Sequence, residues 1–316
     1  MKFQYKLLFL LIGLISTIKA LPQSDISMAT NWYNRANYNP ATITRDDYLY
    51  LFSSIRKQWV GVEGSPTTVN IQASQYFREQ KSAVGFSLIG DKIGVVQTLN
   101  PMASYAYRVS YNRTRWLSMG LSAGLFYRSV NSALYEAETI SDPSISYDAE
   151  TMLRPDANIG FEYQTKHFIY TLSSTHLLSI GKSDNLLLNS NHRYCGVIYK
   201  SSSSALYNYN VGLQFVNRQN IFNAEANACI RIKHQTGLVS GPREIIEFGA
   251  TLRTSRQLTL LAGINITPDI KVGYAYNQSF ITGYYPNSTH EIMFEYRIPR
   301  KSAFSGNYHN RGFWYN

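Results

Sequence analysis

Apolar residues recur at every second position in one short segment after another, from residue 46 almost to the end of the chain. In residues 290–298, Ile292 and Phe294 fall on one face, whereas Glu291 and Glu295 fall on the other. A β-strand sorts such residues onto two faces, but a helix would scatter the charges around its circumference. The pattern therefore predicts an all-β chain.

Two all-β architectures share this alternation. A soluble β-sandwich buries its apolar faces and turns its polar faces to water. A transmembrane barrel turns its apolar faces to lipid and its polar or small residues to the lumen. The second face of these segments is made of charged, amide, hydroxyl and glycine residues, and the chain contains 25 Tyr. Aromatic residues of this abundance, in strands of about ten residues joined by hairpins, favour the barrel over an exported sandwich.

The first twenty residues have the features of an export signal. Lys2 and Lys6 precede an apolar run from 7 to 15, and Ala20 is a small residue before a cleavage point. The apolar run is too short to span about 30 Å of hydrocarbon as a helix, which makes a membrane anchor the weaker interpretation. The segment therefore predicts a protein that leaves the cytoplasm, and we expect it in the bacterial outer membrane.

About fourteen strands are predicted, and an even number brings both chain ends to the periplasmic side. The fold class is thus a transmembrane antiparallel up-and-down β-barrel. The predicted strands are 46–57, 64–77, 82–90, 99–110, 114–129, 156–164, 167–178, 192–200, 205–217, 221–234, 244–254, 257–267, 269–280 and 288–298. The predicted divisions are a signal peptide (1–20), a periplasmic segment or plug (21–45), the barrel (46–298) and a basic aromatic tail (299–316). Interfacial girdle positions are predicted at Tyr48, Tyr50, Trp59, Tyr105, Tyr107, Trp116, Phe126 and Tyr127.

No pattern of catalytic or ligand-binding residues accompanies the strands. The six histidines lack metal-ligand spacing, and no nucleophile, phosphate-loop or dinucleotide motif occurs. Cys195 and Cys229 are predicted to be separate buried thiols. The net charge of +10 is spread along the chain, without the compact basic cluster of a nucleic-acid site. We therefore expect neither an enzyme nor a cofactor, and no nucleic acid as a partner.

Several short segments, the tail after Pro299 among them, are not explained by barrel architecture alone. Together with two residues of the last predicted strand, they contain the candidate partner-contact or structural residues. Hairpin turns, a periplasmic plug or lead-in, and a frayed terminus are the simpler interpretations. These residues are Asn39 and Pro40; Arg56, Lys57, Gln58, Trp59 and Gly61; Asp91, Lys92 and Gly94; and His290 and Glu291.

These segments resemble, in order, the motifs of the PorP/SprF family of type IX secretion system membrane proteins of the Bacteroidetes. The matching strings are Asn-Pro-Ala at 39–41, Arg-Lys-Gln-Trp-Val-Gly at 56–61, Asp-Lys-Ile-Gly at 91–94 and His-Glu-Ile-Met at 290–293. The residues after Pro299 extend beyond the usual end of the family.

The resemblance implies a non-enzymatic component that supports secretion or surface anchoring of cargo such as gliding adhesins. The implied partners are outer-membrane lipid, a type IX cargo protein with a C-terminal signal, and the periplasmic type IX ring or peptidoglycan-linked components. A passive pore or small-hydrophobe transporter is the competing hypothesis. Its lumen would be lined by Lys271, Glu247, Arg253, Glu291, Glu295 and Arg297.

Overall fold

The computed structural model describes residues 28–45, 48–130, 150–179, 190–202, 206–218, 221–235, 242–280 and 288–299. The predicted signal peptide and almost all of the predicted tail lie outside these residues. Fourteen strands account for most of the described chain. They are β1 (Tyr48–Gln58), β2 (Thr67–Phe77), β3 (Ser82–Ile93), β4 (Val96–Ser110), β5 (Trp116–Val130), β6 (Glu150–Gln164), β7 (Phe168–Thr175), β8 (His192–Lys200), β9 (Tyr207–Arg218), β10 (Ile221–Gln235), β11 (Pro242–Arg253), β12 (Gln257–Asn265), β13 (Ile270–Ser279) and β14 (Ser288–Pro299).

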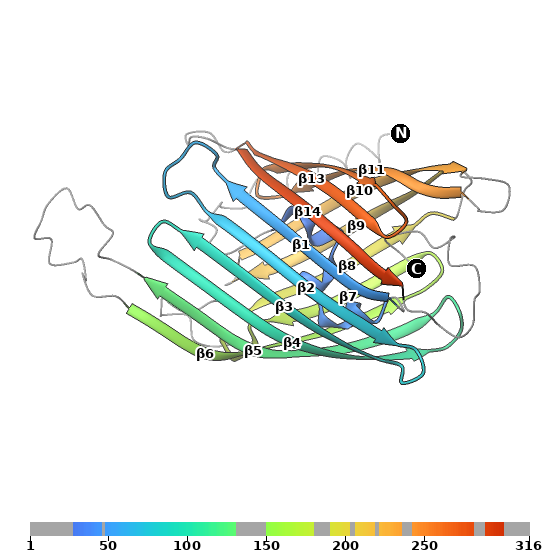
Figure 1. Cartoon of the computed structure of the whole chain (residues 1–316), viewed down its shortest axis with the longest axis horizontal. Coiled ribbons are helices and arrows are strands. Elements are labelled where there is room, and N and C mark those ends of the chain that lie inside the picture. The colour runs from blue at the N-terminus through green and yellow to red at the C-terminus, as the bar shows by residue number, and fades with distance from the viewer. Residues whose placement is uncertain are drawn as a thin grey trace, which may run out of the picture.

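The strands form one closed antiparallel barrel in which each pairs with its neighbours in sequence (Figure 1). β1 closes the barrel against β14, with Tyr48 opposite Pro299 and Gln58 opposite Thr289. The predicted fold class and number of strands are therefore confirmed. Closure pairs the backbone groups of every strand on both sides, as a sheet in lipid requires.

The two ends of the barrel differ in their connections. One end, which we call the loop rim, carries the connections 59–66, 131–149 and 176–191. The opposite end, the turn rim, carries the short connections 78–81, 111–115 and 165–167, together with the start of β1 and the end of β14. Bacterial barrels place both chain ends and the short turns in the periplasm, which assigns the loop rim to the cell exterior.

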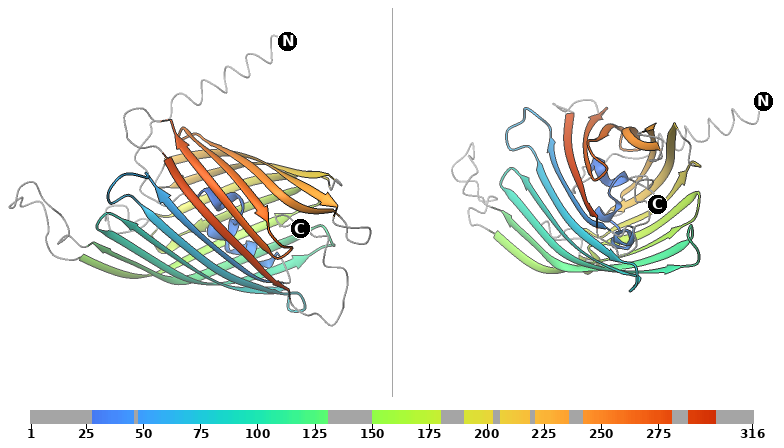
Figure 2. Two further views of the ribbon diagram at one scale, coloured as in Figure 1. Left: turned by 45° about the horizontal axis from the view of Figure 1, so that its top comes forward. Right: turned by 45° about the vertical axis from the view of Figure 1, so that its right-hand side comes forward.

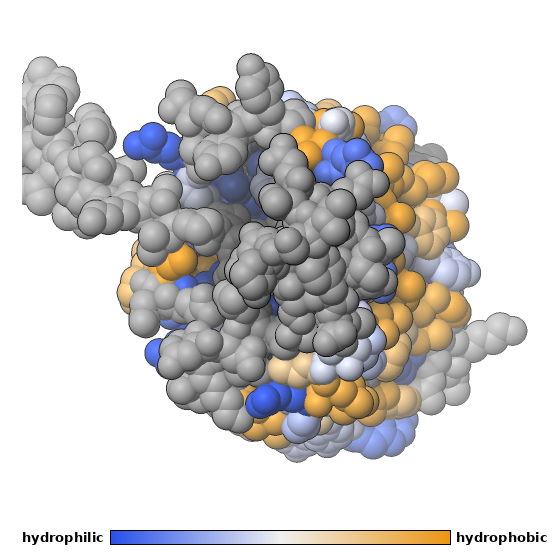
Figure 3. Space-filling view, turned by 90° about the vertical axis from the view of Figure 1, so that its left-hand side faces the viewer, coloured by the Kyte–Doolittle hydropathy of each residue, from blue (hydrophilic) through white to orange (hydrophobic). Residues whose placement is uncertain are grey.

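Side chains of the strands are sorted as in a membrane barrel. In β14, Ile292 and Phe294 are 55% and 42% exposed on the outer wall, whereas Glu291 and Glu295 are each only 1% exposed in the interior. Hydrophobic residues cover much of the outer wall in the view onto the loop rim (Figure 3). A soluble sandwich would have the reverse arrangement, so the barrel interpretation holds. None of the described helices has the length and apolarity needed to span a bilayer.

Some local predictions were wrong. Residues 91–98 lie between the predicted strands 82–90 and 99–110, but most of them are strand, because β3 and β4 extend to a two-residue turn at Gly94 and Val95. Trp116 and Phe126, predicted for the girdles, are 3% and 5% exposed and point inward. The guanidinium of Arg108 lies 3.8 Å from the Trp116 ring centroid, which gives this inward ring a cationic partner.

The cysteine prediction was half right. Cys229 is buried, but Cys195 is exposed, because it alternates onto the outer wall of β8.

Residues 28–45, which we call the interior segment, lie inside the barrel (Figure 2). They form three short 3-10 helices: η1 (Ala29–Trp32), η2 (Arg35–Asn37) and η3 (Pro40–Thr44). The first helix contacts β13 and β14, whereas η3 contacts strands from β2 to β6. The segment therefore crosses from one wall of the barrel to the other before it joins β1.

Candidate functional site

Polar contacts fix the interior segment to the barrel wall. Arg35, which is fully buried, donates from Nε and Nη2 to the two carboxylate oxygens of Glu162 on β6, at 2.8 and 3.0 Å. Asn34 Nδ2 donates to Gln72 Oε1 on β2 at 2.7 Å. Two-point pairing between a guanidinium and a carboxylate is strong and directional, so Arg35 sets the position of the segment against β6.

Aromatic side chains of η1 and the following residue reach the opposite wall. Trp32 Nε1 donates to Glu225 Oε2 on β10 at 3.1 Å. The ammonium of Lys271 lies 5.4 Å from the Tyr33 ring centroid and also pairs with Glu247 on β11. These two rings are 4% exposed, which means that they fill the lumen as core side chains.

The wall has glycines where the interior segment comes closest. A Cβ atom at Gly160 would overlap Asn39 Oδ1, and one at Gly120 would overlap the backbone of Pro40 and Ala41. A Cβ at Gly212 would likewise overlap the Trp32 ring. The sequence of the wall is thus fitted to the segment, as in a protein core packed at normal density.

Asn39 and Pro40 of the first motif are structural residues of this segment. The Asn39 side chain accepts from Ala41 N at 2.9 Å and donates to Thr171 Oγ1 on β7 at 2.7 Å. Asn39 is the N-cap of η3, and Pro40 occupies its first turn, where the missing N–H costs nothing. Because both lie inside the barrel, the structure does not bring them together with the other motif residues.

The remaining motif residues gather at one corner of the loop rim. We call this region, residues 56–66, 90–95 and 289–291, the signature corner. Gly94 N donates to Gly64 O at 2.8 Å, which joins the β1–β2 loop to the β3–β4 turn. Thr68 Oγ1 donates to Asp91 Oδ1 at 2.6 Å beneath this contact. Lys57 Nζ closes the loop by donating to Ser65 O at 3.0 Å.

Backbone conformation explains the glycines of the corner. Gly61 has φ of 96° and Gly94 has φ of 54°, in the left-handed region that side chains disfavour. Trp59 also has a left-handed φ of 52°, which is strained for a bulky residue. Trp59 is 42% exposed, and other apolar residues of the same loops are exposed as well. These are Val60, Val62 and Ile93.

Glu291 links the signature corner to the interior segment. Its carboxylate accepts from Ala29 N at 2.7 Å and from Thr30 Oγ1 at 2.5 Å. In the β1–β14 register Glu291 lies opposite Arg56, which is only 9% exposed and faces the lumen. The interior segment and the outer corner are therefore parts of one connected structure.

The charged residues predicted to line a wet lumen are buried, and most of them are engaged in ion pairs. Arg253 Nε lies 3.0 Å from Glu225 Oε1, and Arg297 Nε lies 3.1 Å from Glu295 Oε1. Lys271 pairs with Glu247 and is fully buried. Among the described residues, no group of three or more His, Cys, Asp or Glu is arranged to hold a metal ion.

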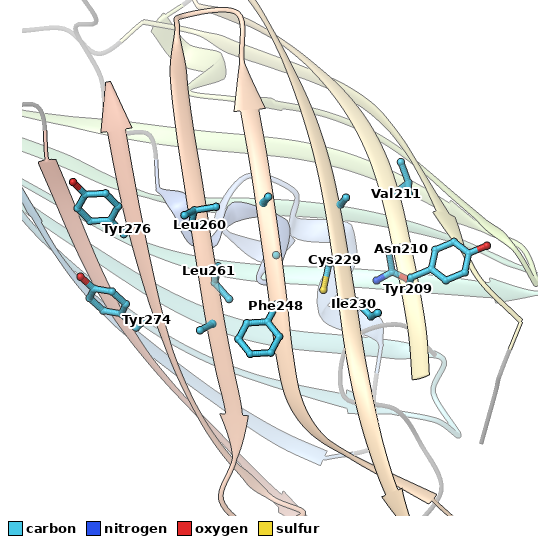
Figure 4. Close-up of a pocket in the computed structure, with 14 residues that line it drawn as sticks. Tyr209, Asn210, Val211, Cys229, Ile230, Phe248, Leu260, Leu261, Tyr274 and Tyr276 are labelled. Atoms are coloured by element: carbon cyan, nitrogen blue, oxygen red, sulfur yellow. The ribbon is translucent and has the colours of Figure 1, made fainter. Parts of the chain in front are cut away.

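A hollow of about 610 Å³ lies in the wall formed by β9 to β13 (Figure 4). Its exposed lining residues belong to the outward face of the strands, and short alanines among them leave the space. The hollow therefore opens on the lipid-facing side and provides no route along the lumen. The exposed residues that line the hollow are Tyr209, Val211, Ala228, Ile230, Phe248, Ala250, Leu260, Ala262 and Tyr274.

Comparison with known families decides the assignment. Residues 21–296 match the family described as type IX secretion system membrane protein PorP/SprF. The chain belongs to the PorP/SprF family. It is therefore a type IX secretion membrane component built as an outer-membrane β-barrel. No curated protein matches the chain.

The chain is also similar, at low identity, to several solved structures. A Pseudomonas aeruginosa FadL homologue is 8% identical, with a TM-score of 0.49 over 86% of this chain and 98% of that chain. The CymD monoaromatic hydrocarbon channel is 10% identical, with a TM-score of 0.47 over 87% and 93% of the two chains. Acinetobacter baumannii Omp33 is also 10% identical, with a TM-score of 0.44 over 79% and 98%.

Several residues that organise this PorP/SprF barrel were missed by the sequence interpretation. Arg35 and Glu162 lie 127 positions apart, and nothing in either local pattern indicates that they pair. Glu162 could have been identified from the sequence as a residue that needs a partner, because a carboxylate within an alternating strand of a barrel must face the lumen and find a donor there.

Proposed function

We propose that this PorP/SprF protein supports secretion or surface anchoring of specific type IX cargo and contacts the cargo, or a secretion partner, at the signature corner. The observation that carries the proposal is the gathering of Trp59, Val60, Val62 and Ile93 at one exposed corner of the loop rim. Exposed apolar side chains held on short, hydrogen-bonded loops are typical of interaction surfaces, and Trp is a favoured anchor there.

The interior segment supports a role other than passive transport. Its buried side chains fill the middle of the lumen, and lumenal carboxylates are occupied by donors of the segment, as Glu162 is by Arg35 and Glu291 by Ala29 and Thr30. We propose that residues 28–45 act as a resident plug. Passage of a solute would require breaking these contacts, which makes the pore or small-hydrophobe hypothesis the less supported one.

The two rims of the barrel face different compartments, and each is therefore assigned a different kind of partner. We propose that cargo with a C-terminal signal, adhesins among them, meets the loop rim. The turn rim faces the periplasm and is the side on which ring or peptidoglycan-linked components would bind. The last strand, β14, ends at Pro299 on this same side.

Gene deletion followed by a surface proteome tests this function. We expect one or more type IX cargo proteins to disappear from the surface and to return when the wild-type gene is restored. Unchanged secretion and anchoring of every type IX cargo would contradict the proposal.

Conductance separates the pore hypothesis from the plugged barrel. Purified wild-type protein in planar bilayers should be silent, whereas removal of the contacts made by Arg35 should produce openings. Steady conductance of the wild-type protein would favour a pore.

A further inference from the structure

The outer wall beneath the loop rim carries a row of basic residues. In the strand registers His290 of β14 lies opposite Lys57 of β1, Lys57 lies opposite Thr67 of β2, and Thr67 lies opposite Lys92 of β3. Neighbouring strands are about 4.8 Å apart, so two lysines and an imidazole lie within roughly 15 Å along the rim. We call Lys57, Lys92 and His290 the basic row.

The basic row lies directly above the apolar belt of the barrel. Two positions further along the same strands, Ile292, Ile55 and Val69 are exposed on the outer wall. Two residues of a strand span about 7 Å, which at the usual tilt of such strands is a rise of about 5 Å along the membrane normal, the step from the edge of the hydrocarbon to the headgroups. Each member of the row therefore lies near the loop-rim end of its strand, on the side of the apolar belt where the outer-leaflet headgroups are expected.

The cationic character of the row is not cancelled by neighbouring acids on the same face. Asp91 and Glu291 alternate to the lumen side, where they accept from Thr68 and from Ala29 and Thr30. The Lys92 side chain is exposed, and its ammonium makes no hydrogen bond or ion pair with the side chains that the structure describes. The outward residues that continue the row on β4, β5 and β6 are uncharged: Gln97, Ser129 and Thr151.

Neighbouring contacts orient two members of the row. Lys57 Nζ donates to Ser65 O and to Thr67 Oγ1, each at 3.0 Å, which holds the ammonium at the rim. The Tyr274 hydroxyl contacts His290 Nδ1, and the Tyr276 ring packs edge-on at 5.3 Å between centroids. With Nδ1 engaged, Nε2 is the ring nitrogen that remains for a ligand. Tyrosines at this level are typical of the interfacial belt.

We propose that the basic row binds the phosphorylated headgroup of an outer-leaflet lipid. Lysine ammonium groups recognise phosphate as compact charges, and a headgroup with two phosphates can span positions separated by two strands. The charge of the row and its height above the apolar belt both match such a lipid, which would contact the outward face of the signature corner, since the row is part of it. This inference does not depend on the proposed role in secretion.

Lipid retention by the purified full-length barrel tests the proposal. The protein is placed in phosphatidylcholine nanodiscs that contain a minor amount of diphosphoryl lipid A, and bound lipid is counted by native mass spectrometry. The double variant Lys57→Gln/Lys92→Gln should retain less lipid A, by about fivefold for each lysine removed. Lys57→Arg/Lys92→Arg keeps both charges and should retain it. Arg193→Gln removes an exposed outward cation of β8 at the same rim and serves as the matched control.

Each result is decisive because folding is checked separately by heat-dependent mobility on gels. Selective loss in the double Gln variant, with retention in the Arg variant and the control, supports the proposal. Equal retention in all variants, or equal loss in the Arg193→Gln control, overturns it. Displacement of lipid A by inorganic phosphate alone would also overturn it, because it would indicate a site for free phosphate.

Discussion

Glu162→Gln should release the interior segment from the barrel wall. The substitution leaves the Arg35 guanidinium, which is fully buried, without its carboxylate partner. Breaking a buried ion pair by removing one partner costs about 3–5 kcal/mol. Since about 1.4 kcal/mol corresponds to a factor of ten, the undocked population should rise by roughly two to three orders of magnitude.

Thiol labelling measures that population. Thr42 is fully buried in η3, so a Thr42→Cys reporter reacts with a maleimide only when the segment leaves the wall. The reporter is placed in a Cys195→Ala/Cys229→Ala background, which removes both native thiols. The labelling rate should increase by about a hundredfold or more in the Glu162→Gln variant.

Two controls make the result specific. The double variant Arg35→Met/Glu162→Met removes both charges and should return the labelling rate close to that of the parent, because an apolar pair of similar volume carries no unpaired charge. Glu63→Gln, in the exposed β1–β2 loop, should have no effect. If Glu162→Gln left the labelling rate unchanged in a folded barrel, the Arg35 contact would not hold the segment, and the reasoning would be refuted.

Three further predictions follow from the wall of the lumen and from the signature corner. Gly160→Ala should destabilise docking of the interior segment by about 1–3 kcal/mol, measured by the same labelling, whereas Gly90→Ala, whose Cβ would meet Leu99 Cδ1 at 3.6 Å, should be neutral. Lys271→Met should lower the urea midpoint of the detergent-solubilised barrel, because Glu247 loses its closest cation, and the exposed Lys92→Gln should not; equal midpoints would contradict the importance of this pair. Trp59→Asn should leave stability unchanged or slightly improved, since Asn tolerates the left-handed φ of 52°, and a large loss of stability would show that the indole is structural.

The barrel could be predicted from the sequence because alternation is a local property. The alternation of apolar and polar residues within one strand indicates which side chains face lipid and which face the lumen. Residues such as Ile292 and Glu291 were therefore assigned to the correct faces. Strand ends were less certain, because polar residues near a rim fit both a strand and a loop. This is why Asp91 and Lys92 proved to belong to β3 and not to a loop.

The contents of the lumen could not be predicted in the same way. Residues 28–45 have no strand period, and their partners are brought near only when the barrel closes. Trp116 broke the simple rule that aromatics face outward, because the wide lumen needs large side chains and Arg108 offers its ring a cation. The motif residues were found as strings, but their separation into one group inside the barrel around Asn39 and another at the loop rim around Trp59 required the fold.

The measurement that tests the central claim most directly is the amount of type IX cargo on the surface of a deletion strain restored with defined variants. Trp59→Asn removes the exposed indole of the signature corner, and Tyr111→Asn removes a 64% exposed tyrosine from the turn rim as the matched control. With equal amounts of folded barrel in the outer membrane, we predict that Trp59→Asn fails to restore cargo and that Tyr111→Asn restores it. Full restoration by Trp59→Asn would contradict the claim that this corner is where the barrel serves secretion.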